Sequence, residues 1–231
     1  MPSVRGVDLK RELANSPVEG LSPARARLHH RAIELIKAED LLEASYSYNI
    51  VSLDRSADGP RLQAGGETLE ASRLLPESGQ LMAIGCGVYT LGPRFEARIS
   101  ELFQQRQAAL AVVLDDIGTE LLFAMGRRIQ DRMLSECYRK RLSMGAELHA
   151  GDPGLELDTQ AAVLRLAEGS KIGVALHRGQ LITPLKSGSV VFAVGRNLPE
   201  VAWSRCDSCP SKKKCNFGRR QRNAVPLPLS A

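Results

Sequence analysis

The sequence predicts an α+β fold, in which a mainly antiparallel, twisted sheet is flanked by helices. Apolar residues repeat at helical spacing along residues 28–42 and 121–137, which indicates amphipathic helices. Short apolar runs at residues 80–89 and 172–194 have the turn-rich borders that are typical of strands. The later runs follow one another without an intervening helix, and such a meander favours antiparallel pairing.

The composition is that of a globular chain with a packed core. Its 231 residues are 43% hydrophobic, which excludes wholesale disorder. No run of 18 apolar residues is present, so no membrane association through a spanning helix is expected. The first residues lack the apolar segment of a secretory signal. Five cysteines, an odd count, indicate reduced thiols and therefore a cytoplasmic location.

The N-terminal quarter is expected to contain one helix and one strand. Residues 1–23 are polar and are predicted to form an N-terminal arm with at most one helical turn. Ser22 and Pro23 are suited to the N-cap and first position of a helix that runs to about Ser45. A short strand is then expected at residues 48–53.

The next segment leads from an irregular connection into a strand. Residues 54–78 are rich in Gly, Ser, Asp and Pro and are expected to be irregular, with room for one short strand. Residues 80–89 are a candidate strand that Gly85 and Gly87 break. Cys86 lies between these glycines and is expected to be a small core residue.

Two helices and a strand are expected in the middle of the chain. Phe95, Ile99, Leu102 and Phe103 share one face of the first helix. The apolar run 108–114 has strand length, and Asp115 and Asp116 are then expected at the N-terminus of the second helix. A stripe of apolar residues four apart along this helix predicts a buried face: Leu121, Met125, Ile129, Met133 and Cys137.

The C-terminal half begins with glycine-rich turns and ends in a meander. An acidic turn at residues 151–154 precedes a short helix at residues 158–167, with Asp158 as its N-cap. Residues 172–176 and 180–182 are expected to form a hairpin, to which residues 189–194 add a third antiparallel strand. The main domain thus covers residues 24–196, and a basic, cysteine-rich tail covers residues 197–231.

The order of short motifs from residue 136 to residue 195 resembles the activation (reactivation) domain of cobalamin-dependent methionine synthase. That family's core reads R-x-S-P-G, L-x-D-Q, I-G-V-x-L and P-x-K-S-x-S in this order. The chain has matching residues at Arg141, Ser143 and Gly145, at 157–160, at 172–176 and at 184–189. Met144 stands where the family has proline, and Ala146 where it has tyrosine. The likeness extends upstream to about residue 80.

The resemblance implies an accessory role in cobalamin-dependent methyl transfer. The protein would dock on a cobalamin-binding methyltransferase or methionine synthase and support reductive methylation of its cofactor by S-adenosylmethionine, with a redox protein as a further partner. Arg141, Ser143 and Gly145 would bind S-adenosylmethionine, since an arginine suits a carboxylate and a glycine permits close approach. Lys186 and Ser187 match the family's K-S pair and are the remaining candidate binding residues. No catalytic side chain is predicted.

The tail contains a candidate metal site with the spacing C-x2-C-x5-C. Its cysteines are Cys206, Cys209 and Cys215, and thiolates two residues apart suit one metal. An iron–sulfur cluster, structural zinc and free thiols all remain open. Cys86, Cys137, His149, His177 or a partner could supply a fourth ligand.

The charge of the chain is concentrated in this tail. Residues 205–222 carry a net charge of +6, whereas the rest of the chain carries −1. One alternative function is therefore a zinc-stapled basic module that binds nucleic acid, although the few aromatic residues are an argument against nucleic-acid binding. Another alternative is a non-catalytic subunit of a split methionine synthase.

Overall fold

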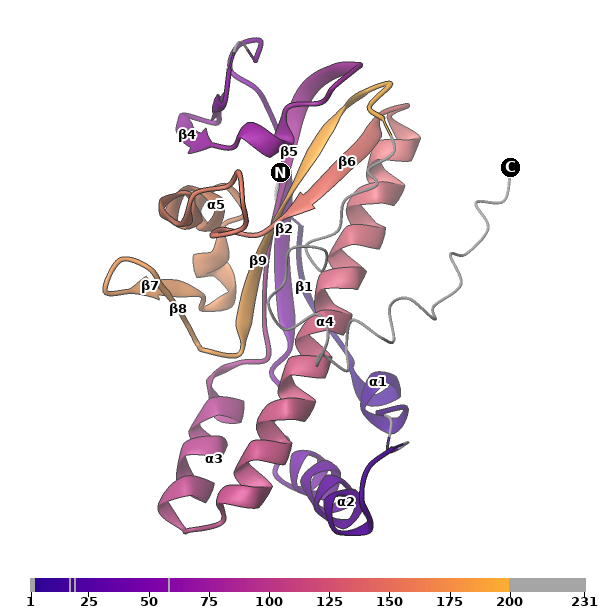
Figure 1. The fold of residues 1–231 in the computed structure, drawn as a ribbon, viewed down its shortest axis with the longest axis vertical. Coiled ribbons are helices and arrows are strands. Elements are labelled where there is room, and N and C mark those ends of the chain that lie inside the picture. The colour runs from indigo at the N-terminus through magenta and orange to yellow at the C-terminus, as the bar shows by residue number, and fades with distance from the viewer. Residues whose placement is uncertain (1–2, 17, 19, 58, 200–231) are drawn as a thin grey trace.

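The computed structural model describes residues 3–16, 18, 20–57 and 59–199 of the chain, and Figure 1 shows their arrangement. The predicted α+β class is confirmed: one antiparallel sheet is flanked by helices. The sheet has the strand order β1-β2-β5-β9-β6. Its strands are β1 (Ser3–Gly6), β2 (Ser45–Ser52), β5 (Gln80–Thr90), β9 (Ser187–Arg196) and β6 (Ser143–Leu148).

The long helix α4 (Ala108–Arg139) crosses one face of this sheet and extends beyond its lower end (Figure 1). Its predicted stripe is confirmed, since every one of the five residues from Leu121 to Cys137 is buried. Gly85 and Gly87 do not break β5 but lie under this helix. A Cβ atom on Gly85 would lie 2.8 Å from Met133 Sδ, and one on Gly87 would lie 2.8 Å from Ile129 Cγ2. The two glycines therefore allow α4 to pack directly on the centre of the sheet.

The prediction of a strand at residues 108–114 is wrong, because these residues form the first two turns of α4. Ala and Leu are strong helix formers, and a short apolar run cannot by itself distinguish a buried helix from a strand. Asp115 and Asp116 consequently lie inside the helix and not at its start. Asp116 forms an ion pair of 2.5 Å with Arg25 of α2.

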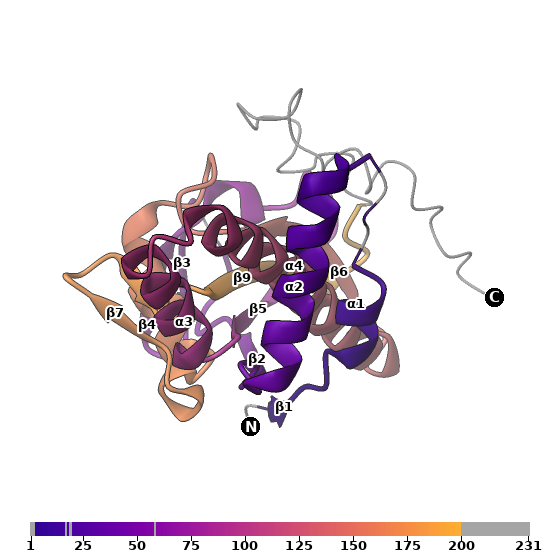
Figure 2. The ribbon, with the colours of Figure 1, turned by 90° about the horizontal axis from the view of Figure 1, so that it is seen from below.

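Three further helices pack around α4 at the lower end of the molecule (Figure 2). They are α1 (Lys10–Ala14), α2 (Pro23–Ala38) and α3 (Pro93–Gln104). The predicted start of α2 is confirmed, because Ser22 Oγ accepts the Arg25 N–H at 3.3 Å and Pro23 is the first helical residue. The helix ends at Ala38, well before the expected Ser45.

Residues 3–14 differ from the expected polar arm. β1 pairs with β2 at the edge of the sheet. Leu9 and Leu13, each 2% exposed, belong to the core between the sheet and α4. Two leucines four residues apart among charged neighbours are too weak a pattern to reveal this burial from the sequence.

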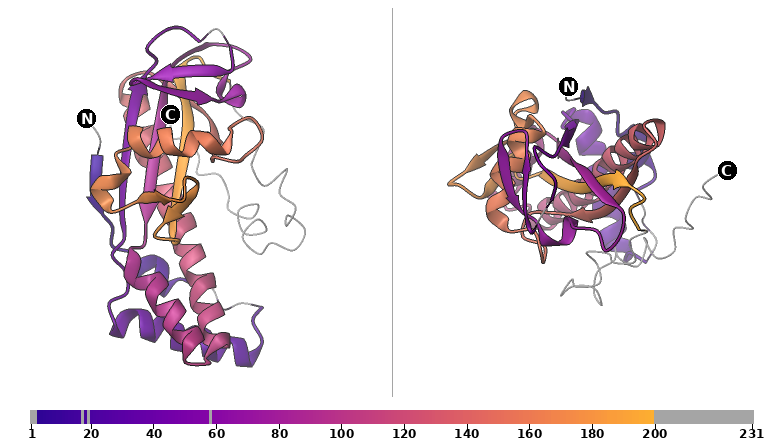
Figure 3. Two further views of the ribbon diagram at one scale, coloured as in Figure 1. Left: turned by 90° about the vertical axis from the view of Figure 1, so that its left-hand side faces the viewer. Right: turned by 90° about the horizontal axis from the view of Figure 1, so that it is seen from above.

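The opposite face of the sheet carries smaller elements, which Figure 3 shows in front of the strands. They are the hairpin β3 (Arg61–Ala64) and β4 (Glu67–Glu70), the helix α5 (Gln160–Leu166) and the hairpin β7 (Ala175–His177) and β8 (Leu181–Thr183). The predicted hairpin is therefore present, but β9 does not extend it. β9 lies inside the main sheet between β5 and β6. Among the described residues, none of the helices combines the length and apolar character that a membrane span requires.

The short helix α5 begins later than expected. Leu157–Thr159 form a 3₁₀ turn, and Thr159 occupies the N-cap position, where its side chain makes no capping hydrogen bond. Asp158 is therefore part of this turn and does not cap the helix.

Candidate functional site

Arg141 lies in the turn between α4 and the edge strand β6. Its backbone has a φ of 56°, and its N–H donates to the Tyr138 carbonyl at 3.0 Å, which ends the helix. The side chain is exposed, and it forms no ion pair with any residue that the structure describes. Its guanidinium is therefore available to a carboxylate or phosphate.

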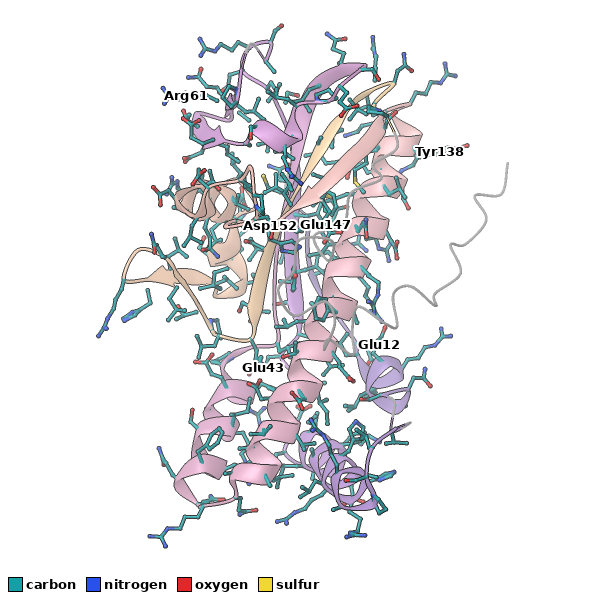
Figure 4. All side chains as sticks on the ribbon, in the orientation of Figure 1. Glu12, Glu43, Arg61, Tyr138, Glu147 and Asp152 are labelled. Carbon is teal, nitrogen blue, oxygen red and sulfur yellow. The ribbon has the colours of Figure 1, made fainter. Side chains whose placement is uncertain are left out.

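Tyr138 is an exposed aromatic residue beside this turn and is not among the site residues that the sequence predicts. It is 81% exposed, and Figure 4 labels it near the upper end of α4. Leu134, one helical turn earlier, is 42% exposed. Tyr138 follows Cys137, the last residue of the buried stripe, so the helical period could have placed it on the outer face.

Ser143 and Gly145 lie on β6, at the edge of the sheet. Ser143 pairs with Gly195 of β9, and a β-bulge follows between Met144 and Glu147. A Cβ atom on Gly145 would lie 3.3 Å from Ala193 Cβ and 3.5 Å from Leu198 Cδ1. Close packing within the protein therefore accounts for this glycine, and the space beside it is not open to a ligand on that side.

Lys186 is a buried cation at the opposite end of β9. It is 9% exposed. Its Nζ lies 2.8 Å from Asp115 Oδ1 and donates to the Asp115 carbonyl at 3.1 Å and to Thr119 Oγ1 at 3.0 Å. These contacts connect the start of β9 to α4 and satisfy the charge of the lysine within the protein.

Ser187 takes part in a neighbouring set of hydrogen bonds. Its hydroxyl donates to Thr90 Oγ1 at 2.8 Å, and the same oxygen accepts the Gly92 N–H at 3.0 Å. The Leu91 N–H donates to the Lys186 carbonyl at 2.8 Å. These bonds connect the end of β5 and the start of β9 to the turn that leads into α3.

The structure does not bring the five predicted binding residues together. β6 pairs with the end of β9 through Ser143 and Gly195, whereas Ser187 is the first residue of β9. At about 3.3 Å per residue, Ser187 lies about 26 Å along β9 from Gly195, the residue that pairs with Ser143. The group at 141–145 and the group at 186–187 are therefore at opposite ends of this strand. Their joint role as one ligand site is therefore not supported by proximity, and Arg141 remains the candidate with a free charged group.

A cluster of polar side chains follows β6. Figure 4 shows Glu147 and Asp152 close to each other in front of the sheet. His149 Nε2 lies 3.0 Å from Glu147 Oε1. The backbone N–H of His149 donates to Asp152 Oδ2 at 2.8 Å. Gly151 and Gly154 have φ values of 91° and 83°, so the acidic turn is present as predicted. Asp152 stabilises this turn.

The proposed fourth metal ligands differ in their availability. Cys86 and Cys137 are fully buried, and burial raises the pKa of Cys86 to about 12 and that of Cys137 to about 11. Both thiols are therefore protonated and inaccessible at neutral pH. His177 lies on β7 and is exposed. Cys206, Cys209 and Cys215 lie outside the described residues, and the described residues contain no group of three side chains suited to a metal.

Comparisons with known proteins agree with this fold. No family model and no curated protein matches the sequence. The crystal structure of the MetH reactivation domain bound to AdoHcy is similar, with a TM-score of 0.61 and 12% sequence identity. The match covers 96% of this chain and 86% of that chain. The chain therefore has the fold of a methionine synthase reactivation domain.

Proposed function

We propose that the protein docks on a cobalamin-binding methyltransferase or methionine synthase and supports its reactivation by reductive methylation. The observation that carries this proposal is the similarity of fold, which covers 96% of this chain. The motif order from Arg141 to Ser189 supports it independently, because sequence spacing and fold similarity point to the same domain. The cobalamin belongs to the partner, and the protein acts by positioning the methyl donor against it.

S-adenosylmethionine is the proposed methyl donor. The similar domain is bound to AdoHcy, which is S-adenosylmethionine without the transferred methyl group. The residues of this chain fit one end of such a molecule. The exposed guanidinium of Arg141 suits the carboxylate, and its position beyond the last turn of α4 leaves it accessible. Gly145, Lys186 and Ser187 have intramolecular partners that account for them, so binding of the donor depends on Arg141.

We place the docking surface at the upper end of α4. This surface, here called the Tyr138 surface, consists of Leu134, Tyr138 and Arg141. Exposed tyrosine and arginine are enriched in protein interfaces and contribute much of their binding energy. The surface adjoins β6, an edge strand of the sheet.

Binding measurements with a cobalamin-binding domain test this proposal. Surface plasmon resonance should detect association of the full chain, and Tyr138→Ala should weaken it by about tenfold or more, the loss expected for a central interface tyrosine. Val112→Ala is the matched control, because Val112 is 48% exposed on the other end of the same helix. Absence of binding refutes the proposal, and equal effects of the two substitutions refute the Tyr138 surface.

The tail adds a separate hypothesis about the source of electrons. An iron–sulfur cluster on Cys206, Cys209 and Cys215 would supply the electron that reduces the partner's cofactor. Protein purified without oxygen should then be brown, with charge-transfer absorption and bound iron. A colourless sample that contains zinc contradicts the cluster and leaves a structural role for the metal.

Nucleic-acid binding is an alternative prediction. It is supported by the net charge of +6 on residues 205–222 of the tail. Affinity for DNA or RNA that falls steeply with salt would favour it. No measurable affinity at low salt would exclude it.

A further inference from the structure

A charged cleft lies on the other side of the molecule from β6, between the N-terminal edge of the sheet and α4. Its volume is about 470 Å³. One wall consists of β1 and the turn that leads from it into α1, which contribute Arg5 and Asp8. The other wall is α4, which contributes Arg128, Asp131 and Arg132. Figure 4 labels Glu12 on α1, which lies beside α4.

The charges in this cleft are of both signs and most of them are not paired. Arg128 forms an ion pair with Glu12 of α1. Arg5, Arg132 and Asp131 form no ion pair with any residue in the described part of the chain. Asp8 Oδ1 accepts the Lys10 N–H at 2.9 Å, which leaves its other oxygen available. Two guanidinium groups that form no ion pair with a described residue, those of Arg5 and Arg132, thus line the same space as the carboxylates of Asp8 and Asp131.

Tyr46 lines the same cleft from β2. Tyr46 is 3% exposed. Its ring therefore offers an apolar surface to the cleft.

We propose that this cleft binds the α-amino-carboxylate group of an amino acid or of an amino-acid derivative. Arg5 and Arg132 bind the carboxylate, since guanidinium groups suit it bidentately. Asp131 binds the ammonium group. A simple anion would be repelled by Asp8 and Asp131, and a simple cation by Arg5 and Arg132, whereas a zwitterion pairs with both sets of charges. This inference does not depend on docking to a cobalamin protein.

Calorimetric titration of L-methionine into the full chain tests the inference. Binding is expected, and Arg132→Gln and Asp131→Asn should each weaken it by about tenfold. N-acetyl-L-methionine, which lacks the ammonium group, should show a similar loss. Arg127→Gln is the matched control, because Arg127 is an exposed arginine of the same helix outside the cleft. Asp131 and Arg132 are exposed residues at the rim of the cleft. Circular dichroism should therefore show that both variants fold like the unmodified protein.

A second titration distinguishes a free amino acid from S-adenosylmethionine, which carries the same group. If S-adenosylmethionine binds more tightly than L-methionine and Arg132→Gln weakens it by about tenfold, the derivative is the ligand of the cleft. Binding of S-adenosylmethionine that Arg132→Gln leaves unchanged occurs at the Arg141 turn and does not count toward the cleft. If L-methionine binds more tightly, the free amino acid is the ligand. The inference is wrong if neither L-methionine nor S-adenosylmethionine binds at millimolar concentration. It is also wrong if inorganic phosphate binds as tightly as L-methionine. The docking experiment above can fail or succeed without changing these results.

Discussion

Lys186 provides the sharpest test of whether a predicted binding residue is structural. Lys186→Met removes the ammonium group and keeps a flexible apolar chain of similar length. The substitution deletes the contacts to Asp115 and Thr119 but preserves packing of the chain against Gly118, whose Cβ position lies 3.3 Å from Lys186 Cε. It therefore isolates the polar contribution of the lysine.

The expected loss of stability follows from the number and exposure of these contacts. Hydrogen bonds to charged groups contribute about 1.5–3 kcal/mol each when they are buried. The Asp115 side chain is 49% exposed, so water screens its ion pair, and the pair itself contributes at most about 1 kcal/mol. Desolvation of the nearly buried ammonium offsets part of the sum. We expect a net loss of about 2 kcal/mol, which corresponds to a decrease in Tm of about 4–8 °C for a chain of this size.

Thermal unfolding by circular dichroism measures this loss, and binding of S-adenosylmethionine and of the cobalamin partner is measured on the same variant. Affinity for both should be unchanged at a temperature where the protein is folded. Asp115→Asn serves as a control that removes only the screened ion pair and should cost about 0.5 kcal/mol. An unchanged Tm together with lost binding would refute the structural assignment and would make Lys186 a ligand-binding residue.

Three further perturbations test the packing, the electrostatics and the thiols. Gly87→Val places a side chain where α4 leaves no room and should destabilise the protein by about 1–3 kcal/mol, as measured by urea unfolding. The Arg165 guanidinium holds the pKa of Glu67 below its usual value through two hydrogen bonds of 2.5 and 2.7 Å. The contribution of this pair to the free energy of unfolding is therefore present above the pKa of Glu67 in the unfolded chain, about 4.3. It is lost as the pH falls through the lower pKa of Glu67 in the folded protein. Arg165→Gln should lower the free energy of unfolding by less than about 1 kcal/mol at pH 7, because the pair is largely exposed, and should not change it in strong acid. A difference in stability that persists in strong acid would contradict this linkage. Cys86 and Cys137 should resist iodoacetamide at pH 8 in folded protein and react after denaturation, as mapped by mass spectrometry; labelling of either in the folded state would contradict its burial.

The elements that the sequence predicted well are those encoded by local patterns. The start of α2 was readable because Ser22 and Pro23 have capping chemistry that acts within one turn. The buried stripe of α4 was readable because its period is that of the helix. Residues 108–114 were misread as a strand, since seven apolar residues fit either structure.

The candidate site was predictable only in part. The motif order singled out Arg141, and the structure shows that it lies in the turn just after α4, beyond the predicted apolar stripe. The charged cleft at Arg5 and Arg132 was not predictable. Its two walls are more than 120 residues apart in the sequence, and no local pattern relates them.

By itself, the sequence determined the fold class, the helical stripe and the motif order that resembles a reactivation domain. Only the tertiary structure decided which strands are neighbours. β9 lies between β5 and β6 and not beside the hairpin that precedes it. This arrangement places Arg141 and Lys186 at opposite ends of one strand. The physical reason is that hydrogen bonding makes any strand a potential partner of any other, so the choice among them depends on which faces α4 and α5 can bury.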